Sequence, residues 1–175
     1  MLKTRILCKA IMDIKLFDAD MLSALDAKAQ NSPRRRSNYN VHDDMEDPVQ
    51  RLFITLYPDS FVRPHRHSQE NKWEFFLMIS GELSFLLFDE DGICTGRHEL
   101  SANGNCRGLE VPPHVWHCIA PGSEPATFFE VKMGPYAPID DKDFASWSPK
   151  EGEANAAAFQ EALKLVQPGE KVELK

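Results

Sequence analysis

The sequence predicts a mainly β fold, an antiparallel sandwich or barrel with one helix before it and another after it. Between residues 49 and 132, short segments rich in aromatic and β-branched residues alternate with turn residues, and no helical pattern intervenes. Helical spacing of apolar residues is confined to the two ends of the chain. A chain of 175 residues, 42% of them hydrophobic, has the size of one domain that forms its core without disulfides or a structural metal.

Two helices are expected at the ends. In the stretch 18–30 apolar residues recur at helical spacing, and Asp18 or Asp20 can cap the first turn. The stretch 154–166 has the pattern of a C-terminal helix, which Pro168-Gly169 ends. These limits divide the chain into an N-terminal extension (1–15), a domain with its leading helix (16–138) and a C-terminal helical segment (139–175).

Six short strands are expected between the helices, at residues 49–57, 73–79, 82–88, 97–100, 115–120 and 127–132. Asp91-Gly92 is a strong hairpin signal between two of them. The strand around Phe75 is apolar on both faces, so its outer face needs cover. The N-terminal helix or a second copy of the chain would supply this cover, and a homodimer is the oligomer we expect.

Charge and composition exclude several classes of partner. The net charge is −7, and the basic cluster at Arg34 to Arg36 stands alone, so we expect no nucleic-acid partner. The longest apolar run, 75–79, is far shorter than the roughly 20 residues of a membrane-spanning helix. Lys9 interrupts the apolar start, which therefore lacks a signal-peptide pattern, and the 4 cysteines are widely spaced, as for free thiols in a reducing compartment. We expect a cytoplasmic protein that does not bind membranes.

Three of the 6 histidines stand in an arrangement that suits a metal ion. His65 and His67 are two residues apart, so in an extended segment both side chains point to one side. Glu74 opens the next strand, and His117 lies on a later one. Converging inside a barrel, these side chains would bind one divalent transition metal (Fe, Mn, Ni, Co or Zn) and leave positions for water or substrate. His-x-His alone more often marks a pair of surface histidines, so the interpretation depends on the surrounding residues.

The surrounding residues form two frames. Glu74 is followed after six residues by Gly81, and the second frame runs Pro112-Pro-His-Val-Trp-His117. Together with His65 and His67, these frames resemble the two motifs of the cupin superfamily, G-x5-H-x-H-x3-4-E-x6-G and G-x5-P-x-G-x2-H-x3-N. The resemblance implies an antiparallel β-barrel of jelly-roll type with a bound metal.

The frames depart from the motifs at several places, and Cys106 and Pro121 stand where the second motif has its first Gly and its last Asn. Asp59 and His114 stand where the motifs have glycine, and both residue types tolerate positive φ, so we expect the turns to survive. Six residues rather than three or four separate His67 from Glu74, which leaves Glu70 as a rival ligand. Because Glu74 opens an apolar strand and Glu70 lies in a polar loop, Glu74 is the ligand we expect.

A closer resemblance covers the chain from about Leu16 to Pro138. It is carried by Ser32-Pro-Arg-Arg-Arg-Ser-Asn-Tyr-Asn-Val-His42, Asp47-Pro-Val-Gln-Arg-Leu52, the spacing His65-x-His67-x6-Glu74, and Glu130-Val-Lys-x-Gly-Pro135. These motifs are similar to those of the WbuC family of cupin-fold metalloproteins. Members of that family are associated with bacterial surface-polysaccharide gene clusters. The resemblance therefore informs fold and metal rather than the reaction.

A polar strip precedes the first expected strand. Arg36, Asn38, Asn40 and His42 alternate along an extended segment and so share a face. They form either a strip that binds a small hydroxyl-rich or anionic molecule at the barrel mouth, or a solvated loop with local side-chain to backbone hydrogen bonds.

Charged residues within or beside the apolar strands allow two interpretations. Because unpaired charge in apolar surroundings is costly, we expect ion pairs inside the barrel, with ligand contact as the alternative, for Arg51, Glu110, Glu130 and Lys132. Catalysis would need a titratable group beside the metal that is not itself a ligand. The candidates for that role are Glu70, Glu110, His114 and His42.

Three functions fit these residues. The first is a metal-dependent enzyme of isomerase or epimerase type, acting on a small polar metabolite such as a sugar or sugar nucleotide, with the metal as Lewis acid. The second is a metal-dependent binding or sensing module without turnover. The third is an Fe(II) dioxygenase, because three histidines and a glutamate suit Fe(II) with open positions.

Overall fold

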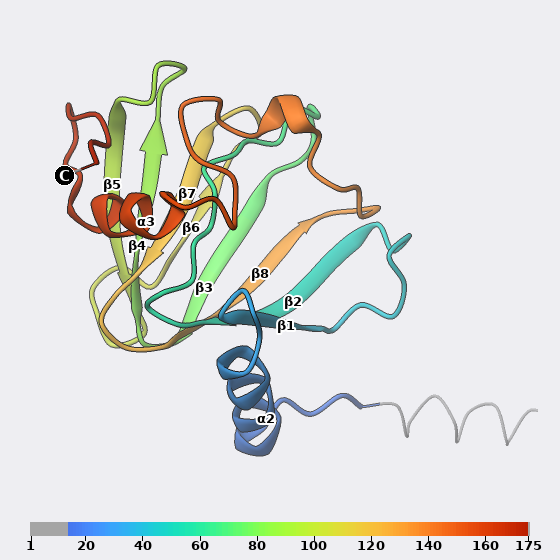
Figure 1. The fold of residues 1–175 in the computed structure, drawn as a ribbon. Helices are drawn as coiled ribbons and strands as arrows, with labels where there is room; N and C mark the ends of the chain where they lie inside the picture. The colour runs from blue at the N-terminus through green and yellow to red at the C-terminus, as the bar shows by residue number, and fades with distance from the viewer. Residues whose placement is uncertain (1–13, 175) are drawn as a thin grey trace, which may run out of the picture.

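The computed structural model describes residues 14–174, which form two antiparallel sheets facing each other (Figure 1). The larger sheet has the strand order β1-β2-β8-β3-β6 and the smaller one β5-β4-β7. The strands are β1 (Arg36–Asn40), β2 (Val49–Leu56), β3 (Glu74–Ser80), β4 (Glu82–Phe88), β5 (Cys94–Ser101), β6 (Gly108–Val111), β7 (Trp116–Pro121) and β8 (Ala126–Met133). The predicted fold class, mainly β and of antiparallel jelly-roll type with a helix at each end, is confirmed. The expected extension (1–15) lies almost wholly outside the described residues.

The main core lies between the sheets. Side chains at alternate positions of each strand point inward, as the pleat requires. Phe76 of β3 and Phe85 of β4 meet across the gap with ring centroids 5.0 Å apart, and Phe128 of β8 packs against Phe76 at 5.4 Å. This core fills one end of the space between the sheets and leaves the other end for polar groups.

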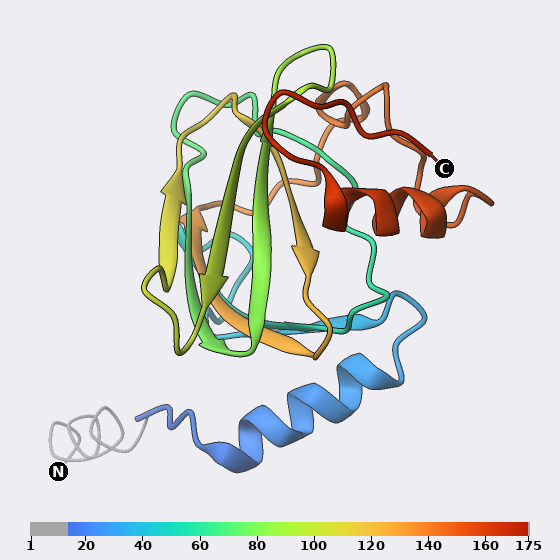
Figure 2. The same cartoon turned by 90° about the vertical axis from the view of Figure 1, so that its left-hand side faces the viewer.

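The N-terminal helix α2 (Ala19–Gln30) lies under β1 and β2 (Figures 1 and 2). Asp18 caps it, as predicted, by accepting a hydrogen bond from the Met21 N–H. Leu25 of the helix packs with Val41 and Phe53 in a small separate core. The helix packs mainly on β1 and β2, and on β3 Leu77 and Ile79 stay 39% and 36% exposed. Cover of this face by a second copy of the chain stays a prediction.

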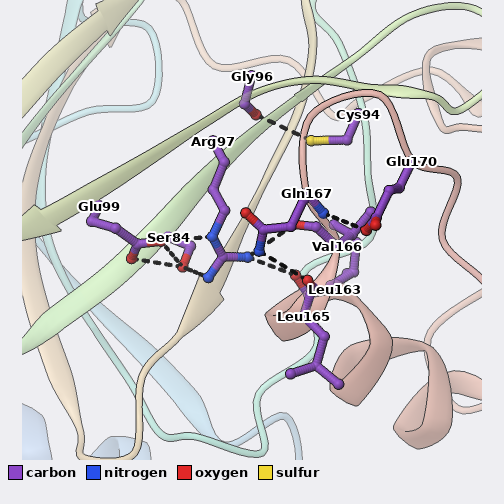
Figure 3. A network of polar contacts seen from close by, with 10 residues as sticks. All are labelled: Ser84, Cys94, Gly96, Arg97, Glu99, Leu163, Leu165, Val166, Gln167 and Glu170. Carbon is purple, nitrogen blue, oxygen red and sulfur yellow. Dashed lines mark hydrogen bonds and ion pairs between the residues drawn. The ribbon is translucent and has the colours of Figure 1, made fainter.

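The C-terminal helix α3 (Ala156–Leu165) packs on the outer face of the smaller sheet. Phe159 and Leu163 enter a second core together with residues of β4 and β7. Arg97 of β5 donates to the carbonyls of Leu163 and Val166 at the end of the helix, at 3.4 and 3.2 Å (Figure 3). The guanidinium therefore holds the helix end against the sheet. None of the helices within residues 14–174 has the length and apolarity needed to cross a bilayer.

Two strands were not among those expected. β1 has Tyr39 as its one aromatic residue among polar ones, and β6 has 4 residues, so neither shows a hydrophobic alternation that could identify it. β1 forms because it pairs with β2, Asn38 opposite Ile54. Pairing with β3 likewise defines β6.

Positive-φ positions support the predicted turns. His114 has φ 68°, so it takes the left-handed conformation that we expected at this position, where the second cupin motif has glycine. Gly81 has φ 70°, and a Cβ there would lie 2.5 Å from the Pro125 carbonyl oxygen. Glycine is therefore required between β3 and β4. Gly92, φ 80°, lies in the turn between β4 and β5, as the Asp91-Gly92 signal predicted.

Candidate metal centre

The segment that carries the first two histidines is joined to β7 by a pair of backbone hydrogen bonds. The His65 N–H donates to the His117 carbonyl at 3.0 Å, and the His117 N–H donates back to the His65 carbonyl at 2.8 Å. This bridge brings the two imidazole rings to 4.5 Å between centroids. The ring of His67, two residues along the extended segment, lies 5.4 Å from that of His65. The three histidines therefore face one point.

Backbone carbonyls orient two of the rings. Nδ1 of His65 lies 2.9 Å from the Arg63 carbonyl oxygen, and Nδ1 of His117 lies 2.9 Å from that of Val115. Because a carbonyl oxygen only accepts, each Nδ1 carries the proton and donates. In the neutral rings Nε2 then presents its lone pair, which is the form that a metal requires.

Glu74 completes the group. It is the first residue of β3 and is only 3% exposed. Its Oε1 lies 3.0 Å from His67 Nε2, and its Oε2 lies 3.2 Å from His117 Nε2. One ligand atom from each of His65, His67, Glu74 and His117 lies within 4.8 Å of the others. The structure thus brings together the four residues that the sequence singled out.

The protonation states of the group suit a cation. Burial, with the neighbouring His117, lowers the pKa of His65 to about 3, so its imidazole is neutral at physiological pH. Burial alone would raise the pKa of Glu74, but His117, His67 and Lys132 outweigh it and hold that pKa well below its usual value. Glu74 is therefore ionised.

Several ligand atoms lack a partner. His67 Nε2, Glu74 Oε2 and His117 Nε2 are buried and have no hydrogen-bond partner within residues 14–174. Because the ring proton of His117 is on Nδ1, its Nε2 and the Glu74 Oε2 atom 3.2 Å away both present lone pairs, which repel each other unless a cation lies between them. Three imidazole nitrogens and one carboxylate oxygen are donors that divalent transition metals accept. The residues present therefore fit a metal ion.

The metal group lines a cavity of about 570 Å³. Apolar walls come from inward residues of β2, β3 and β8, such as Leu52, Phe76 and Phe128. The loop after β8 and the 3-10 helix η1 (Asp141–Asp143) contribute to its lining. The sequence has no periodicity in that loop from which its position could have been predicted.

All four residues of the polar strip line this cavity, so the structure brings the strip and the metal group together. Arg36 donates to the Phe61 carbonyl at 2.9 Å and pairs at 2.6 Å with Glu151, a carboxylate that it shares with Arg34. Asn38 donates through Nδ2 to Asn40 Oδ1 at 2.6 Å, which leaves the Asn38 oxygen and the Asn40 amide nitrogen for a ligand.

His42 belongs to the strip and is 6% exposed. Its Nδ1 lies 2.9 and 3.0 Å from the carbonyl oxygen and the amide nitrogen of Arg51, which fixes the ring. Its Nε2 is buried and has no partner in the described part of the chain. His42 is therefore the strip residue with the clearest unused hydrogen-bonding capacity.

The other three candidates for proton transfer lie outside the cavity. Glu70 is 93% exposed at its side chain and lies 3.5 Å from His114 Nε2, so the two residues pair at the surface. Glu110 is exposed on β6 opposite Phe75, a position on the outer face of the sheet. None of these three candidates lines the cavity, because the polar loop and the strand register direct their side chains to solvent.

Glu130 and Lys132 occupy inward positions of β8 beside the metal group. Lys132 Nζ lies 2.6 Å from Glu130 Oε1 and 3.3 Å from Glu74 Oε1. The expected ion pair inside the fold is thus present for Glu130 and Lys132, and it extends to the Glu74 carboxylate, which was not predicted. Arg51 and Glu110 are exposed and have no ion pair within residues 14–174, so for them the expectation was wrong. Glu130 and Glu74 raise the pKa of Lys132 although burial opposes this, so the ammonium is charged. In the sequence, the alternation of Phe128, Glu130 and Lys132 already indicated that these three side chains share one face of the strand.

Known proteins resemble the chain mainly in fold. A family model described as a domain of unknown function, DUF6016, matches residues 17–100. No curated protein matches. The WbuC resemblance stays a prediction, since none of these matches bears on it.

Similar solved structures have low sequence identity. The protein TT1209 from Thermus thermophilus is 16% identical, with a TM-score of 0.50 over 69% of this chain and 97% of that one. An oxalate oxidase in complex with glycolate is 14% identical, with a TM-score of 0.49 over 63% of this chain and 57% of that one. A cupin domain of an XRE-family transcriptional regulator from Enterobacter cloacae is 18% identical, with a TM-score of 0.44 over 58% of this chain and 98% of that one. This chain therefore spans little more than half of the oxalate oxidase.

Proposed function

We propose that the chain binds one divalent transition metal through His65, His67, Glu74 and His117. The convergence of their ligand atoms within 4.8 Å, with three of these atoms buried and unpartnered in the described residues, carries the proposal. Fe, Mn, Ni, Co and Zn accept this mixture of nitrogen and oxygen donors. Four protein ligands leave positions for a substrate on a six-coordinate metal.

The metal is proposed to serve an enzyme of isomerase or epimerase type that acts on a small polar metabolite such as a sugar or sugar nucleotide. A divalent metal supplies Lewis-acid polarisation of a carbonyl or enediol oxygen. Asn38 and Asn40 line the same cavity and offer both donors and acceptors, which supports binding of hydroxyl groups. The WbuC resemblance supports the narrower proposal that the metabolite belongs to surface-polysaccharide synthesis.

His42 is proposed to hold or move the proton. Among the four candidates for this role it alone lines the cavity, and its unpartnered atom is the titratable Nε2. The Arg51 backbone fixes the ring, so Nε2 would keep one position during a reaction.

A non-catalytic binding or sensing module is the second candidate. It is favoured by the positions of Glu70, Glu110 and His114, none of which lines the cavity. Such a module would share the metal and the polar strip but would have no need of His42 as an acid or base.

Metal analysis of protein purified without chelators or a His-tag tests the metal centre. We expect one equivalent of metal per chain in the wild type and none in His67→Ala. His98→Ala, at an exposed position on β5, is the matched control and should keep the metal. A full equivalent in His67→Ala, at unchanged affinity, would contradict the assignment.

A thermal-shift screen of sugar nucleotides and small acids on the metal-loaded protein then tests function, because a ligand that binds the folded state raises the melting temperature. Product analysis by NMR with each compound that binds separates the two candidates. The enzyme hypothesis expects turnover that His42→Asn abolishes while the ligand still raises the melting temperature. Binding without turnover would favour the module.

A further inference from the structure

The charged side chains that line the cavity are paired, with one exception among residues 14–174. Each cavity-lining carboxylate has a cation within ion-pair distance, and four of the five cations have a carboxylate. The pairs and their N···O distances are Arg34–Glu151 (2.6 Å), Arg36–Glu151 (2.6 Å), Lys132–Glu130 (2.6 Å), Lys132–Glu74 (3.3 Å), Lys142–Asp140 (3.5 Å) and Arg66–Asp143 (3.5 Å).

The exception is Lys72, which lies in the loop before β3. Its Nζ donates to the carbonyl oxygens of Met133 at 2.7 Å and of Pro135 at 2.6 Å. An ammonium group has three N–H donors, so one remains. The two carbonyls hold the group at the cavity wall, but they do not neutralise its charge.

We infer that the ligand of this cavity carries an anionic group, a carboxylate or a phosphate, which Lys72 binds while the rest of the ligand reaches the metal centre. The inference rests on the proposed function and names the substrate class of the same site. Arg34 and Arg36 share Glu151, and Glu74 and Glu130 share Lys132, so the charges cancel when they are summed over all six pairs. Lys72 and a divalent metal both add positive charge to this balanced space. A neutral ligand would leave Lys72 without a counter-ion, and an anionic ligand supplies one through the free N–H.

The test uses Co²⁺-loaded protein and three probes at constant ionic strength, measured by isothermal titration calorimetry. Acetate and inorganic phosphate represent the two anionic groups, and acetamide is the neutral match to acetate. We expect the wild type to bind at least one anion and to bind acetamide much more weakly. Whichever of acetate and phosphate binds more tightly identifies the group.

Lys72→Met should weaken binding of the preferred anion by about tenfold or more, the effect of losing a hydrogen bond from a charged donor. Lys72→Gln removes the charge but keeps N–H donors for the two carbonyls, so it should show the same loss if Lys72→Met folds poorly. Lys72→Arg should retain most of the affinity. Lys142→Met is the matched control, because Lys142 lines the same cavity but pairs with Asp140, and it should bind like the wild type.

Wild-type affinity in both Lys72→Gln and Lys72→Met would overturn the inference, and so would a wild type that binds neither anion. Equal Co²⁺ content in wild type and variants shows that a loss of affinity does not come from the metal centre. If the wild type takes up no Co²⁺, the proposed function fails, and the same titrations on the metal-free protein still test Lys72.

Discussion

The Glu74 carboxylate lies between two imidazoles and an ammonium group, and it is the carboxylate of the proposed metal centre. Its oxygens are 3.0 Å from His67 Nε2, 3.2 Å from His117 Nε2 and 3.3 Å from Lys132 Nζ. Strand register explains its position, because Glu74 pairs with Lys132 on β8 and Val111 on β6.

We expect Glu74→Gln to weaken metal binding by at least about tenfold, because the amide keeps the shape of the side chain but loses the charge. Glu70→Gln is the control, since its carboxylate is exposed and outside the group. Metal titrations of both variants measure this. If only the Glu70 variant lost affinity, Glu70 would be the ligand.

A second residue-scale prediction separates backbone strain from steric clash. Gly81 and Gly152 both have positive φ, 70° and 84°, but only Gly81 has neighbours within 4 Å of the Cβ position. Gly152→Ala should lower the free energy of unfolding by about 1 kcal/mol through strain alone. Gly81→Ala should cost clearly more, because its Cβ would meet the Pro125 oxygen at 2.5 Å. Urea unfolding of the two variants checks this, and equal losses would contradict it.

At the scale of elements, Arg97 joins α3 to the smaller sheet. Besides the helix carbonyls, its guanidinium contacts Glu99 and Ser84 at 2.6 and 2.7 Å, so it is fixed on the sheet side (Figure 3). Arg97→Met should lower the free energy of unfolding by about 2 kcal/mol, since charged hydrogen bonds to the helix end are lost. Glu161→Gln breaks only an exposed pair on the same helix and should cost roughly 0.5 kcal/mol or less. If chemical denaturation gave equal losses of unfolding free energy for the two variants, the contacts of Arg97 with α3 would contribute no more than an exposed ion pair.

The segment before α3 is tied to β1 by Glu151, which pairs with Arg34 and Arg36. Burial alone would raise the pKa of Glu151, but the two guanidinium groups outweigh it and lower that pKa below the usual 4.5. A depressed folded-state pKa stabilises the fold above the unfolded-state value, and this stability is lost as pH falls through the folded-state pKa.

Glu151→Gln should therefore be less stable than the wild type at pH 7, by about 1 kcal/mol or less for a partly exposed group. The difference should shrink as the pH falls below about 4.5. Glu173→Gln, at an exposed position, is the control and should follow the wild type at every pH. Unfolding free energies across the pH range measure this, and a difference that grows in acid would contradict the sign.

At the scale of the whole molecule, the hydrophobic cores are built from side chains other than the candidate metal ligands, of which His117 stacks on Phe85 of the main core at 5.5 Å. Neither large core contains His65, His67, Glu74 or His117. Removing metal with a chelator should therefore lower the melting temperature by mass action while unfolding stays cooperative and β-type circular dichroism is retained. Loss of that signal on chelation would show a structural site instead.

The sequence by itself determined what depends on short-range pattern. Alternation and turn residues located six strands, and Asp18 and the spacing of apolar residues located α2. The resemblance to the cupin motifs singled out His65, His67, Glu74 and His117. The polar strip was also visible, because alternate residues of an extended segment share a face whatever lies opposite.

Only the tertiary structure decided what depends on distant pairing. β1 is a strand because β2 lies beside it, and Glu110 faces outward because of its register against β3. Lys72 donates to the Met133 carbonyl, 61 residues away in the sequence. Arg36 of β1 pairs with Glu151, which lies in the segment before α3. Which charges are balanced and which one remains is a property of the whole packing, since ion pairing depends on distance in space and not on separation along the chain.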